Sequence, residues 1–294
     1  MSIQRISRVA AGVLWLAAGV VPVAHADSRY VTREEKSFTV SGTPEVTLNT
    51  FDGRIEVRSW DKNEVHVTIE RRAASEAEAK GIQVDVRQDG NQVTVEVRKP
   101  TGDWFSWFGR SRSANLIVSV PRSSTLSAGT GDGSIDVGGI NGAVKLHSGD
   151  GSIDVNGVKG DLEATTGDGS IRIDGLDGAL RARSGDGSVR ASGRVSAVEV
   201  RSGDGSVSVN AEPGSSMTSD WSVVSGDGSI TLGLPSDFNA EVDAHTGDGS
   251  VSINGLALKV SGTLRRNTIR GTLGNGGRQL TIRSGDGSII LNSR

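Results

Sequence analysis

A six-residue motif that returns every 18 residues is the feature of this 294-residue chain that most restricts its fold. The motif reads Ser/Thr-Gly-Asp-Gly-Ser-Ile/Val and occurs eight times. Its first five aspartates are 18 residues apart, and the later spacings are 23, 21 and 38. Such a period is typical of repeat proteins in which each unit packs against its neighbours. The aspartates of the motif are Asp132, Asp150, Asp168, Asp186, Asp204, Asp227, Asp248 and Asp286.

Each 18-residue unit divides into two nine-residue halves, and each half contains the pattern of one short strand and one turn. In residues 148–156 and 157–165, glycine holds the fourth place, and apolar residues hold the sixth and eighth. The alternation predicts half-buried strands, and the glycines mark turns that need unusual backbone angles or close approach. The predicted fold is therefore all-β. We expect a β-solenoid, parallel β-helix-like or β-roll-like, with 18-residue coils stacked about 4.8 Å apart.

Stacking of the coils predicts a thin aliphatic core and charged rows outside it. The inward ladder of the first strand would run from Ile135 through Ile153 and Ile171 to Ile289, and Val144 and its equivalents would form a second ladder. Reading every eighteenth residue outside the second ladder gives a row of alternating charge, which in-register parallel strands favour by about 0.2–1 kcal/mol per pair. Coincidence on a solvated face is the alternative. The row is Lys145, Glu163, Arg181 and Glu199.

Two kinds of interruption break the repeat. Residues 69–115 read as an insertion with a short helix over Arg71–Lys80, a hairpin over 82–97 and an aromatic loop. Later insertions around Pro213, around Pro235 and after Asn254 leave the Gly-Asp-Gly-Ser edge uniform. They gather on the other edge, which is therefore a candidate binding face. The outward Ile290 on the final strand predicts an open edge that could pair with another chain.

Residues 1–26 have the pattern of a secretory signal. Two arginines precede an apolar run, and Ala24-His25-Ala26 supplies a small-x-small cleavage site. A membrane anchor is the alternative, but the run is short for a bilayer span. We therefore expect a signal peptide over residues 1–26 and one β-solenoid domain over 27–294. The protein would be exported to the periplasm, with secretion or the cell surface as alternatives.

Composition excludes several classes of function. The chain has no cysteine, which removes disulfides, thiolate metal sites and cysteine nucleophiles. Its formal net charge of -3 does not indicate a nucleic-acid partner. No segment after residue 26 has the hydropathy of a transmembrane helix. The expected partner is an envelope protein or a polysaccharide, and the oligomeric state is open.

The repeated aspartates are the first candidate site. Carboxylates about 4.8 Å apart repel one another, so a stacked column needs a cation or compensating hydrogen-bond donors. The turn chemistry favours aspartates that accept hydrogen bonds from N–H groups of their own turns. Calcium is the alternative, although β-roll calcium repeats place the aspartate after the last glycine rather than between two glycines. No cofactor is otherwise predicted. The cation edge would consist of Asp132, Asp150, Asp168, Asp186 and Asp204.

An aromatic loop at residues 103–109 is the second candidate site. Exposed, its side chains would suit contact with a sugar or a membrane interface. Buried, they would cover the end of the stack, and we favour this interpretation because an open sheet edge needs protection. The binding-surface candidates are Trp104, Phe105, Trp107 and Phe108.

The motifs do not indicate catalysis. A serine recurs in every turn, whereas a catalytic serine needs one particular base and oxyanion site. Gly-Asp-Gly-Ser also lacks the lysine and the following helix of a phosphate loop. His66, His147 and His245 are far apart in the sequence and belong to no metal or nucleophile motif. Paired carboxylates for glycoside hydrolysis have no signature, so no catalytic residue is assigned.

Several segments, together with the serial turns, resemble those of a bacterial adhesin-like family of exported β-strand-repeat proteins. The family is grouped as a domain of unknown function, and the resemblance covers about residues 40–294. It implies a β-solenoid, an envelope location and no established catalytic residues. The segments are Trp60-Asp61, 76–80, 93–97, Trp107-Phe108-Gly109, Val118-Ser119-Val120-Pro121, Gly271-Thr272-Leu273-Gly274 and Ser284-Gly285-Asp286-Gly287.

These observations together predict a non-enzymatic, exported scaffold or adhesin-like binding protein of the bacterial envelope. Two alternatives stay open. One is a calcium-binding, β-roll-like protein that uses the Gly-Asp-Gly-Ser edge. The other is a polysaccharide-active enzyme on a β-helix.

Overall fold

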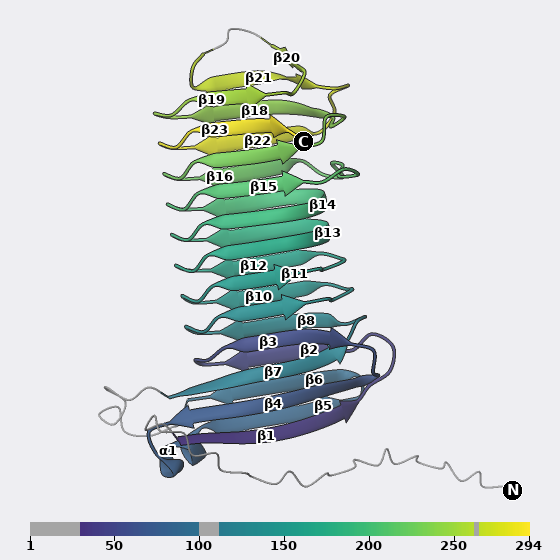
Figure 1. Ribbon diagram of the computed structural model, residues 1–294, viewed down its shortest axis with the longest axis vertical. Coiled ribbons are helices and arrows are strands. Elements are labelled where there is room, and N and C mark those ends of the chain that lie inside the picture. The colour runs from purple at the N-terminus through teal and green to yellow at the C-terminus, as the bar shows by residue number, and fades with distance from the viewer. Residues whose placement is uncertain (1–29, 100–111, 262–264) are drawn as a thin grey trace, which may run out of the picture.

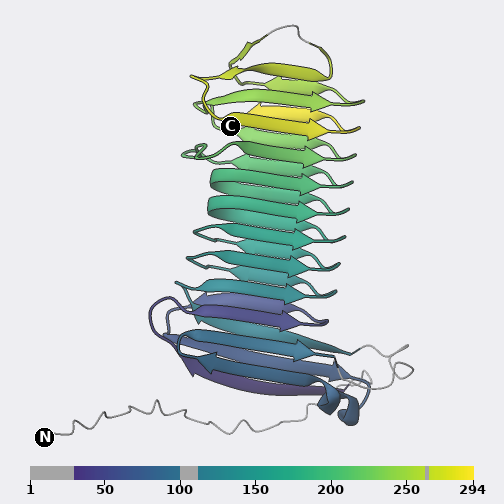
Figure 2. The ribbon, with the colours of Figure 1, turned by 180° about the vertical axis from the view of Figure 1, so that it is seen from behind.

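The computed structural model describes residues 30–99, 112–261 and 265–294. These residues form an elongated stack of short strands with one small helix at its N-terminal end (Figure 1). The all-β prediction is confirmed. From behind, the same stacking is visible, with a turn projecting from the edge of each layer (Figure 2). The apolar side chains are buried between two faces of stacked strands.

Each Gly-Asp-Gly turn joins a strand on one face to a strand on the other, and we call each such pair of strands a tier. The strands that follow the turns form the first face together with β1, β4 and β7. In spatial order, they are β1 (Tyr30–Thr39), β4 (Glu64–Ala73), β7 (Ser113–Pro121), β3 (Ile55–Trp60), β9 (Ile135–Gly138), β11 (Ile153–Asn156), β13 (Ile171–Ser184), β14 (Val189–Ser202), β15 (Val207–Ala211), β17 (Ile230–Leu234), β23 (Ile289–Ser293) and β19 (Val251–Asn254).

The strands that precede the turns form the second face. Strands β13 and β14 belong to both faces because they continue around the opposite edge. In spatial order, the second face holds β5 (Gln83–Asp89), β6 (Gln92–Arg98), β2 (Glu45–Thr50), β8 (Thr125–Thr130), β10 (Val144–Ser148), β12 (Leu162–Thr166), β13, β14, β16 (Trp221–Ser225), β22 (Gln279–Ser284), β18 (Ala240–Thr246), β21 (Thr268–Leu273) and β20 (Leu258–Val260).

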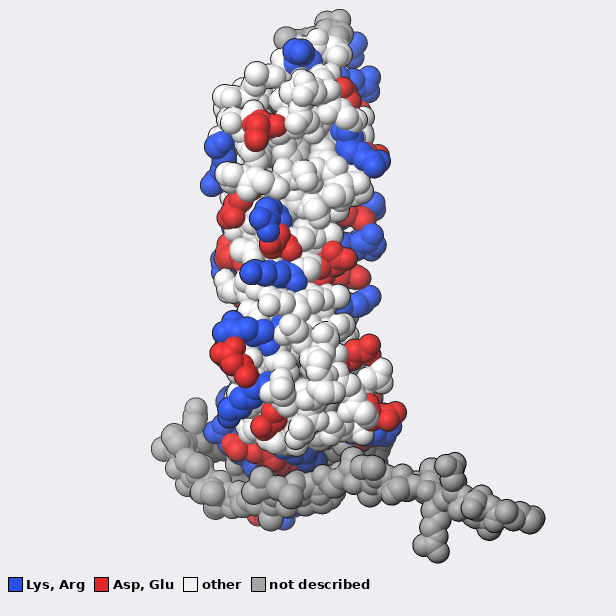
Figure 3. All heavy atoms as spheres, turned by 90° about the vertical axis from the view of Figure 1, so that its right-hand side faces the viewer, with Lys and Arg blue, Asp and Glu red and all other residues white. Residues whose placement is uncertain are grey.

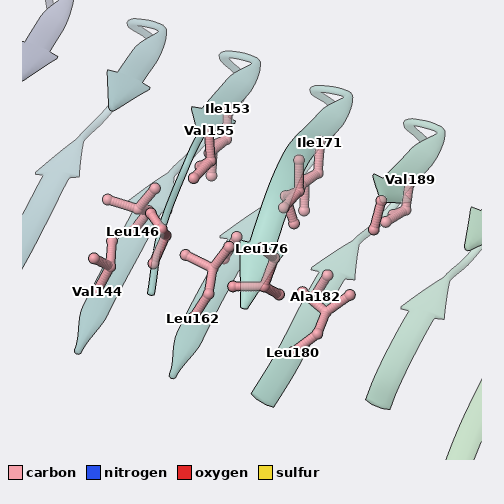
Figure 4. Packing of buried hydrophobic residues seen from close by; sticks show 14 of the residues in the cluster. Val144, Leu146, Ile153, Val155, Leu162, Ile171, Leu176, Leu180, Ala182 and Val189 are labelled. Atoms are coloured by element: carbon pink, nitrogen blue, oxygen red, sulfur yellow. The ribbon is translucent and has the colours of Figure 1, made fainter. Parts of the chain in front are cut away.

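Residues 18 apart lie side by side in the central tiers. Ile153 pairs in parallel with Ile135 on one side and Ile171 on the other. On the second face, Val144 pairs with Leu162 in the same way. These side chains point into the space between the faces (Figure 4). Each fully buried aliphatic side chain contributes about 1.5–3 kcal/mol, so the core is built by repetition.

The insertion near the N-terminus supplies strands that pair within the stack. Its hairpin consists of β5 and β6, as predicted, and turns at Gly90 and Asn91, one residue later than expected, because Asp89 still pairs with Gln92. The helix α1 (Glu76–Gly81) is shorter than predicted. Its N-cap is Ser75, and residues 71–73 belong to β4, because they pair with β1 and extend the sheet. The backbone hydrogen bonds of a strand outweigh the helix propensity of this segment.

The order of tiers in space differs from their order in the chain at both ends. The β2–β3 tier lies between strands β6 and β7 on one side and β8 and β9 on the other. At the other end, the C-terminal β22–β23 tier lies between β16–β17 and β18–β19. The C-terminus therefore lies within the stack (Figure 1). The expectation of an open edge at Ile290 is wrong, because β23 is paired on both sides.

The later insertions lie at the edge opposite the Gly-Asp-Gly turns. Beneath two of them, Trp221 and Phe238 pack with ring centroids 5.0 Å apart. Trp221 is 1% exposed and begins β16 at a position where the neighbouring strand has Leu280. Figure 3 shows this edge, where charged side chains of both signs lie around uncharged surface.

Candidate functional site

A ladder of buried hydroxyl groups holds the Gly-Asp-Gly turns together. The Ser184 hydroxyl donates to the Gly169 carbonyl of the neighbouring tier at 2.9 Å and accepts from the Gly187 N–H of its own turn at 3.0 Å. One side chain thus satisfies a donor and an acceptor that the turn would otherwise leave buried and unpaired. The residue at this position is buried in nine tiers: Thr50, Thr130, Ser148, Thr166, Ser184, Ser202, Ser225, Thr246 and Ser284.

The glycines of these turns are required by the close approach of neighbouring tiers. A Cβ atom on Gly151 would lie 2.0 Å from the Gly133 carbonyl oxygen, a distance that no side chain tolerates. At the opposite edge of the stack, glycine is required for its backbone conformation instead. Gly157 has φ of +64°, where an L residue is strained. The motif therefore describes how tiers approach each other, which explains its regularity without a bound ligand.

The aspartates lie exposed at the tips of the turns. In the described chain, the carboxylates of the predicted cation edge have neither a hydrogen bond nor an ion pair. The expectation that they accept from turn N–H groups is wrong, because the buried hydroxyl of the preceding Ser or Thr accepts instead. No three His, Cys, Asp or Glu side chains among the described residues are arranged to hold a metal ion. The edge comprises Asp132, Asp150, Asp168, Asp186 and Asp204.

Repulsion along this column is visible at its N-terminal end. Asp52 occupies the aspartate position in the β2–β3 tier. Burial, and then the charge of nearby Asp132, raise the pKa of the Asp52 carboxyl. Proximity of like charges favours the neutral form of a carboxyl group. The column therefore has an electrostatic cost that solvent reduces, since the later aspartates are exposed.

A groove of about 590 Å³ crosses six tiers of the second face, and we call it the axial groove. Ala143, Ala179 and Ala197 occupy one column, immediately before β10 and within β13 and β14, interrupted before β12 by Asp161, and the small alanine side chains leave space open. Beneath them, the buried side chains of the following residues, such as Leu180, point into the core. The groove therefore runs along the stack, across the strands.

One wall of the axial groove is the predicted row of alternating charge. Lys145 lies 3.2 Å from Glu163, and Arg181 lies 3.0 Å from Glu199. The alternation prediction is thus confirmed. A hydrogen bond from Arg183, together with the charges of Arg181 and other arginines, holds the pKa of Glu199 below its usual range. Such exposed pairs contribute at most about 1 kcal/mol each, so their main effect is to order the wall.

The axial groove also carries two acids and meets an inserted loop. Asp161 is exposed in the same column as the alanines. Asp220 accepts a hydrogen bond from the Gln279 N–H at 3.0 Å. Ser219 and Asp220 come from the insertion around Pro213. One loop of the predicted binding edge therefore borders the groove.

Sequence reasoning did not identify the axial groove, although a signal for it exists. Aligning the chain with a period of 18 places Thr125, Ala143, Asp161, Ala179 and Ala197 in one column, in which all but Asp161 are small. A column of small residues beside a column of charged ones leaves a depression in a stack of parallel strands. Its depth depends on the neighbouring turn, which the alignment does not reveal.

The first face carries its own cluster of charges near the N-terminal end. Asp136 accepts from Arg58 at 2.8 Å and from Arg54 at 2.9 Å. The hydrogen bond from Arg58 lowers the pKa of Asp136, outweighing the opposing effect of partial burial, and Arg54 adds to it. These residues come from neighbouring strands β3 and β9, so the cluster joins tiers that are distant in the sequence.

The remaining sequence-predicted residues do not assemble into a catalytic group. His66 lies 3.8 Å from Glu35 and beside Trp60, whereas His245 lies 2.8 Å from Thr268. His147 is exposed on β10. The predicted signal sequence over residues 1–26 and the aromatic candidates lie outside the described residues. These candidates are Trp104, Phe105, Trp107 and Phe108. Among the residues that are described, no helix is long and apolar enough to cross a membrane.

The family model of Toastrack DUF4097 matches residues 44–292. The chain belongs to this family. The match covers the stacked strands on both sides of the axial groove and confirms the resemblance seen in the sequence. Toastrack DUF4097 is a domain of unknown function, so membership assigns no ligand.

Solved structures of several bacterial proteins are distantly similar to this Toastrack chain. A candidate lipid-binding protein from Parabacteroides distasonis is 14% identical with a TM-score of 0.47, over 89% of this chain and 96% of that one. A candidate adhesin from Bacteroides fragilis is 11% identical with a TM-score of 0.37, over 89% and 97%. A candidate cell adhesion protein from Clostridium sporogenes is 13% identical with a TM-score of 0.28, over 89% and 100%. A comparison with curated proteins gives no match.

Proposed function

We propose that this protein is a β-solenoid of 18-residue coils that is exported to the bacterial envelope and acts there as a non-enzymatic, adhesin-like binding protein. The axial groove is the observation that carries the proposal, because it is continuous over six tiers and three alanines leave space open along it. The pairing of residues 18 apart supports the solenoid. The signal pattern of residues 1–26 supports export.

The shape of the groove favours an extended ligand. Six tiers about 4.8 Å apart give a length of roughly 24 Å, which matches a linear chain rather than a compact molecule. The charged groups of the wall are paired with one another. A ligand that covers them therefore leaves no buried charge without a partner. An extended segment of an envelope protein or polysaccharide would lie along the stack and contact successive tiers in the same way.

The acids of the groove do not favour hydrolysis of the ligand. A glycosidase needs a carboxylic acid whose pKa is raised so that it can donate a proton. Here the arginines around Glu199 lower the pKa of its carboxyl group. Glu163 is paired with Lys145. The groove is therefore suited to holding a ligand.

Filling the axial groove tests the proposal. The double variant Ala179→Trp, Ala197→Trp places two large side chains in the groove without changing charge. Sedimentation of the purified protein with washed bacterial cells and with isolated cell envelopes measures binding. We expect saturable binding by the native protein and a loss of affinity of at least about tenfold in the variant, equivalent to about 1.4 kcal/mol.

The matched control is Asn156→Trp, which places the same side chain on an exposed position of the first face. It should bind like the native protein. Equal loss in the control and the groove variant would reject the axial groove as the binding site. Absence of saturable binding by the native protein, or release of soluble sugar or peptide fragments, would reject the proposed function.

A further inference from the structure

The first face changes character at β15. From β3 to β14, the central outward position carries a charged side chain on each of five neighbouring strands: Glu56, Asp136, Asp154, Arg172 and Arg190. On the next four strands in space, the same position carries Ser208, Thr231, Ile290 and Ser252. The charged column thus becomes an uncharged one within a single tier.

The positions on either side of this column are also uncharged on those four strands. A serine precedes each strand, and the position after the column holds Asn210, Gly233, Asn292 and Asn254. We call the outward-facing residues of segments 206–210, 229–233, 288–292 and 250–254 the neutral array. Asn254 donates to Asn292 at 2.9 Å, so part of the array is already ordered by its own hydrogen bonds.

We propose that the neutral array is a binding site for uncharged, extended oligosaccharides. Hydroxyl and amide side chains donate to and accept from sugar hydroxyls, and no charged group has to lose its hydration. Ile290 is half-buried at the centre and offers an apolar surface to the C–H face of a ring. The inference deepens the proposed function, since it names a ligand class for an adhesin-like surface and adds a second contact area to the axial groove.

The aspartate border of the array selects against anionic polymers. Along this side run the exposed aspartates of the same four tiers, Asp204, Asp227, Asp286 and Asp248. They repel anionic sugars, and the outward residues of the four segments are themselves uncharged. On the other side, Arg294 lies over Gly233, where a Cβ atom would meet its Nε at 2.9 Å. Its guanidinium group adds donors for sugar hydroxyls at the end of the array.

The size of the array favours a sugar over a protein partner. Four strands about 4.8 Å apart and three outward positions about 6.8 Å apart cover roughly 400 Å². A stable protein interface buries about 800 Å² on each partner, so the array alone is too small for a second copy of the chain. A pyranose ring is about as long as the separation of neighbouring strands. A few linked rings could therefore repeat the same contacts from strand to strand.

The test uses three neutral hexasaccharides, cellohexaose, maltohexaose and chitohexaose, with hexagalacturonate as the anionic counterpart. Titration of the intact ¹⁵N-labelled protein, followed by amide shifts, gives both the affinity and the location. We expect at least one neutral hexasaccharide to shift amides of β15, β17, β23 and β19, and hexagalacturonate to shift none of them.

Two arginine variants in neighbouring tiers, one on each face, serve as a pair. Thr231→Arg places a long charged side chain in the array and should weaken neutral-sugar binding at least about tenfold. Thr281→Arg makes the same change on β22 of the second face and should leave the affinity within about twofold. Absence of binding by all three neutral sugars, shifts elsewhere only, equal binding of hexagalacturonate, or equal effects of the two variants would each overturn the proposal.

The neutral array and the axial groove fail independently. If envelope binding depends on the axial groove while the neutral sugars do not bind, the sugar inference is wrong and the proposed function stands. If the neutral sugars bind the array but the protein does not bind envelopes, the proposed function is wrong and the sugar inference stands.

Discussion

At the scale of single residues, the hydroxyl that precedes each Gly-Asp-Gly turn links neighbouring tiers. It joins a carbonyl of one tier to an amide of the next, at a place where neither group can reach water. The aspartate of the same motif is exposed and makes no comparable link. Two residues that are equally regular in the sequence therefore have very different energetic roles, because only one of them points into the stack.

Replacing Ser184 by Ala should destabilise the protein by about 1–3 kcal/mol, because the variant leaves the Gly169 carbonyl and the Gly187 amide buried without their partner. The control is Ser170→Ala, which removes an exposed hydroxyl of the neighbouring turn and should change stability by less than about 0.5 kcal/mol. Urea unfolding followed by circular dichroism measures both. Similar costs for the two serines would contradict the hydroxyl ladder.

Asp136 should give the protein a measurable acid sensitivity. Arg58, helped by Arg54, lowers the pKa of Asp136 in the fold, so the unfolded chain binds a proton more readily. The resulting stability is complete above the unfolded pKa of about 4 and is lost as pH falls through the lower folded pKa.

The native protein should therefore lose more free energy of unfolding between about pH 5 and pH 2 than Asp136→Asn does. Urea unfolding at a series of pH values tests this. Asn156→Ser is the control, because it changes an exposed side chain of the same face without removing a titratable group; its pH profile should run parallel to that of the native protein. Parallel profiles for the native protein and Asp136→Asn would reject the assignment.

At the scale of elements, each strand is stabilised by the ladder it continues. Ile171 lies between Ile153 and Val189 and is 1% exposed. The next residue, Arg172, points outward and contacts Asp154 at 3.4 Å. Because side chains alternate between the two sides of a strand, residue 171 must be apolar to fill the core, whereas residue 172 faces solvent and can be varied.

Ile171→Asp should destabilise the central tiers by more than about 4 kcal/mol, because it buries a carboxylate without a partner. Arg172→Ser should cost less than about 0.5 kcal/mol, since an exposed ion pair contributes little. Hydrogen exchange of β11, β13 and β14 measures the difference locally. Comparable effects of the two variants would show that the strands are not in this register.

The turn edge should not respond to calcium. A calcium ion at 100 times its dissociation constant would add about 2.7 kcal/mol to the free energy of unfolding and raise the melting temperature. We expect the same melting temperature in millimolar calcium and in chelator, because the buried hydroxyls and glycine contacts already stabilise the turns. An increase that Asp168→Asn and Asp186→Asn together remove would revive the cation edge.

At the scale of the whole molecule, one tier near each end of the stack lies out of chain order. The last tier, β22–β23, separates β16–β17 from β18–β19 on both faces. The segment from β18 to β21 therefore rests on residues that follow it in the chain. Cooperative stability of a stack depends on nearest neighbours, so this tier is a link that the regions on either side share.

Deleting residues 279–294 should therefore unfold residues 240–273, although the deletion removes none of them. Hydrogen exchange should show loss of protection there and retained protection in β8 to β14. The point variant Ile290→Ser is the control, because it changes the surface of the last tier and keeps its pairing. Protection of β18 and β19 in the truncated protein would mean that they dock on β16 and β17 directly.

Much of the central fold could be predicted because its contacts repeat with the sequence period. Ile153 and Ile171, or Lys145 and Glu163, are one period apart, so an alignment of the repeat already places them side by side. The candidate site was harder to predict. The alanines recur with the sequence period, but alanine has no functional group that indicates a site. The aspartates are equally regular, but the contacts at their edge are made by the Ser or Thr hydroxyl that precedes each Gly-Asp-Gly turn.

The sequence by itself determined the strands, the inward ladders and the alternating row, because local alternation and a fixed period specify them. Only the tertiary structure decided which tiers meet at the two ends. There the period is broken, and parallel strands of similar length, such as β19 and β23, can pair with more than one partner. The axial groove and the neutral array also emerge only in the stack. Each is made of side chains from strands that are tens of residues apart, and their shape depends on which strands become neighbours.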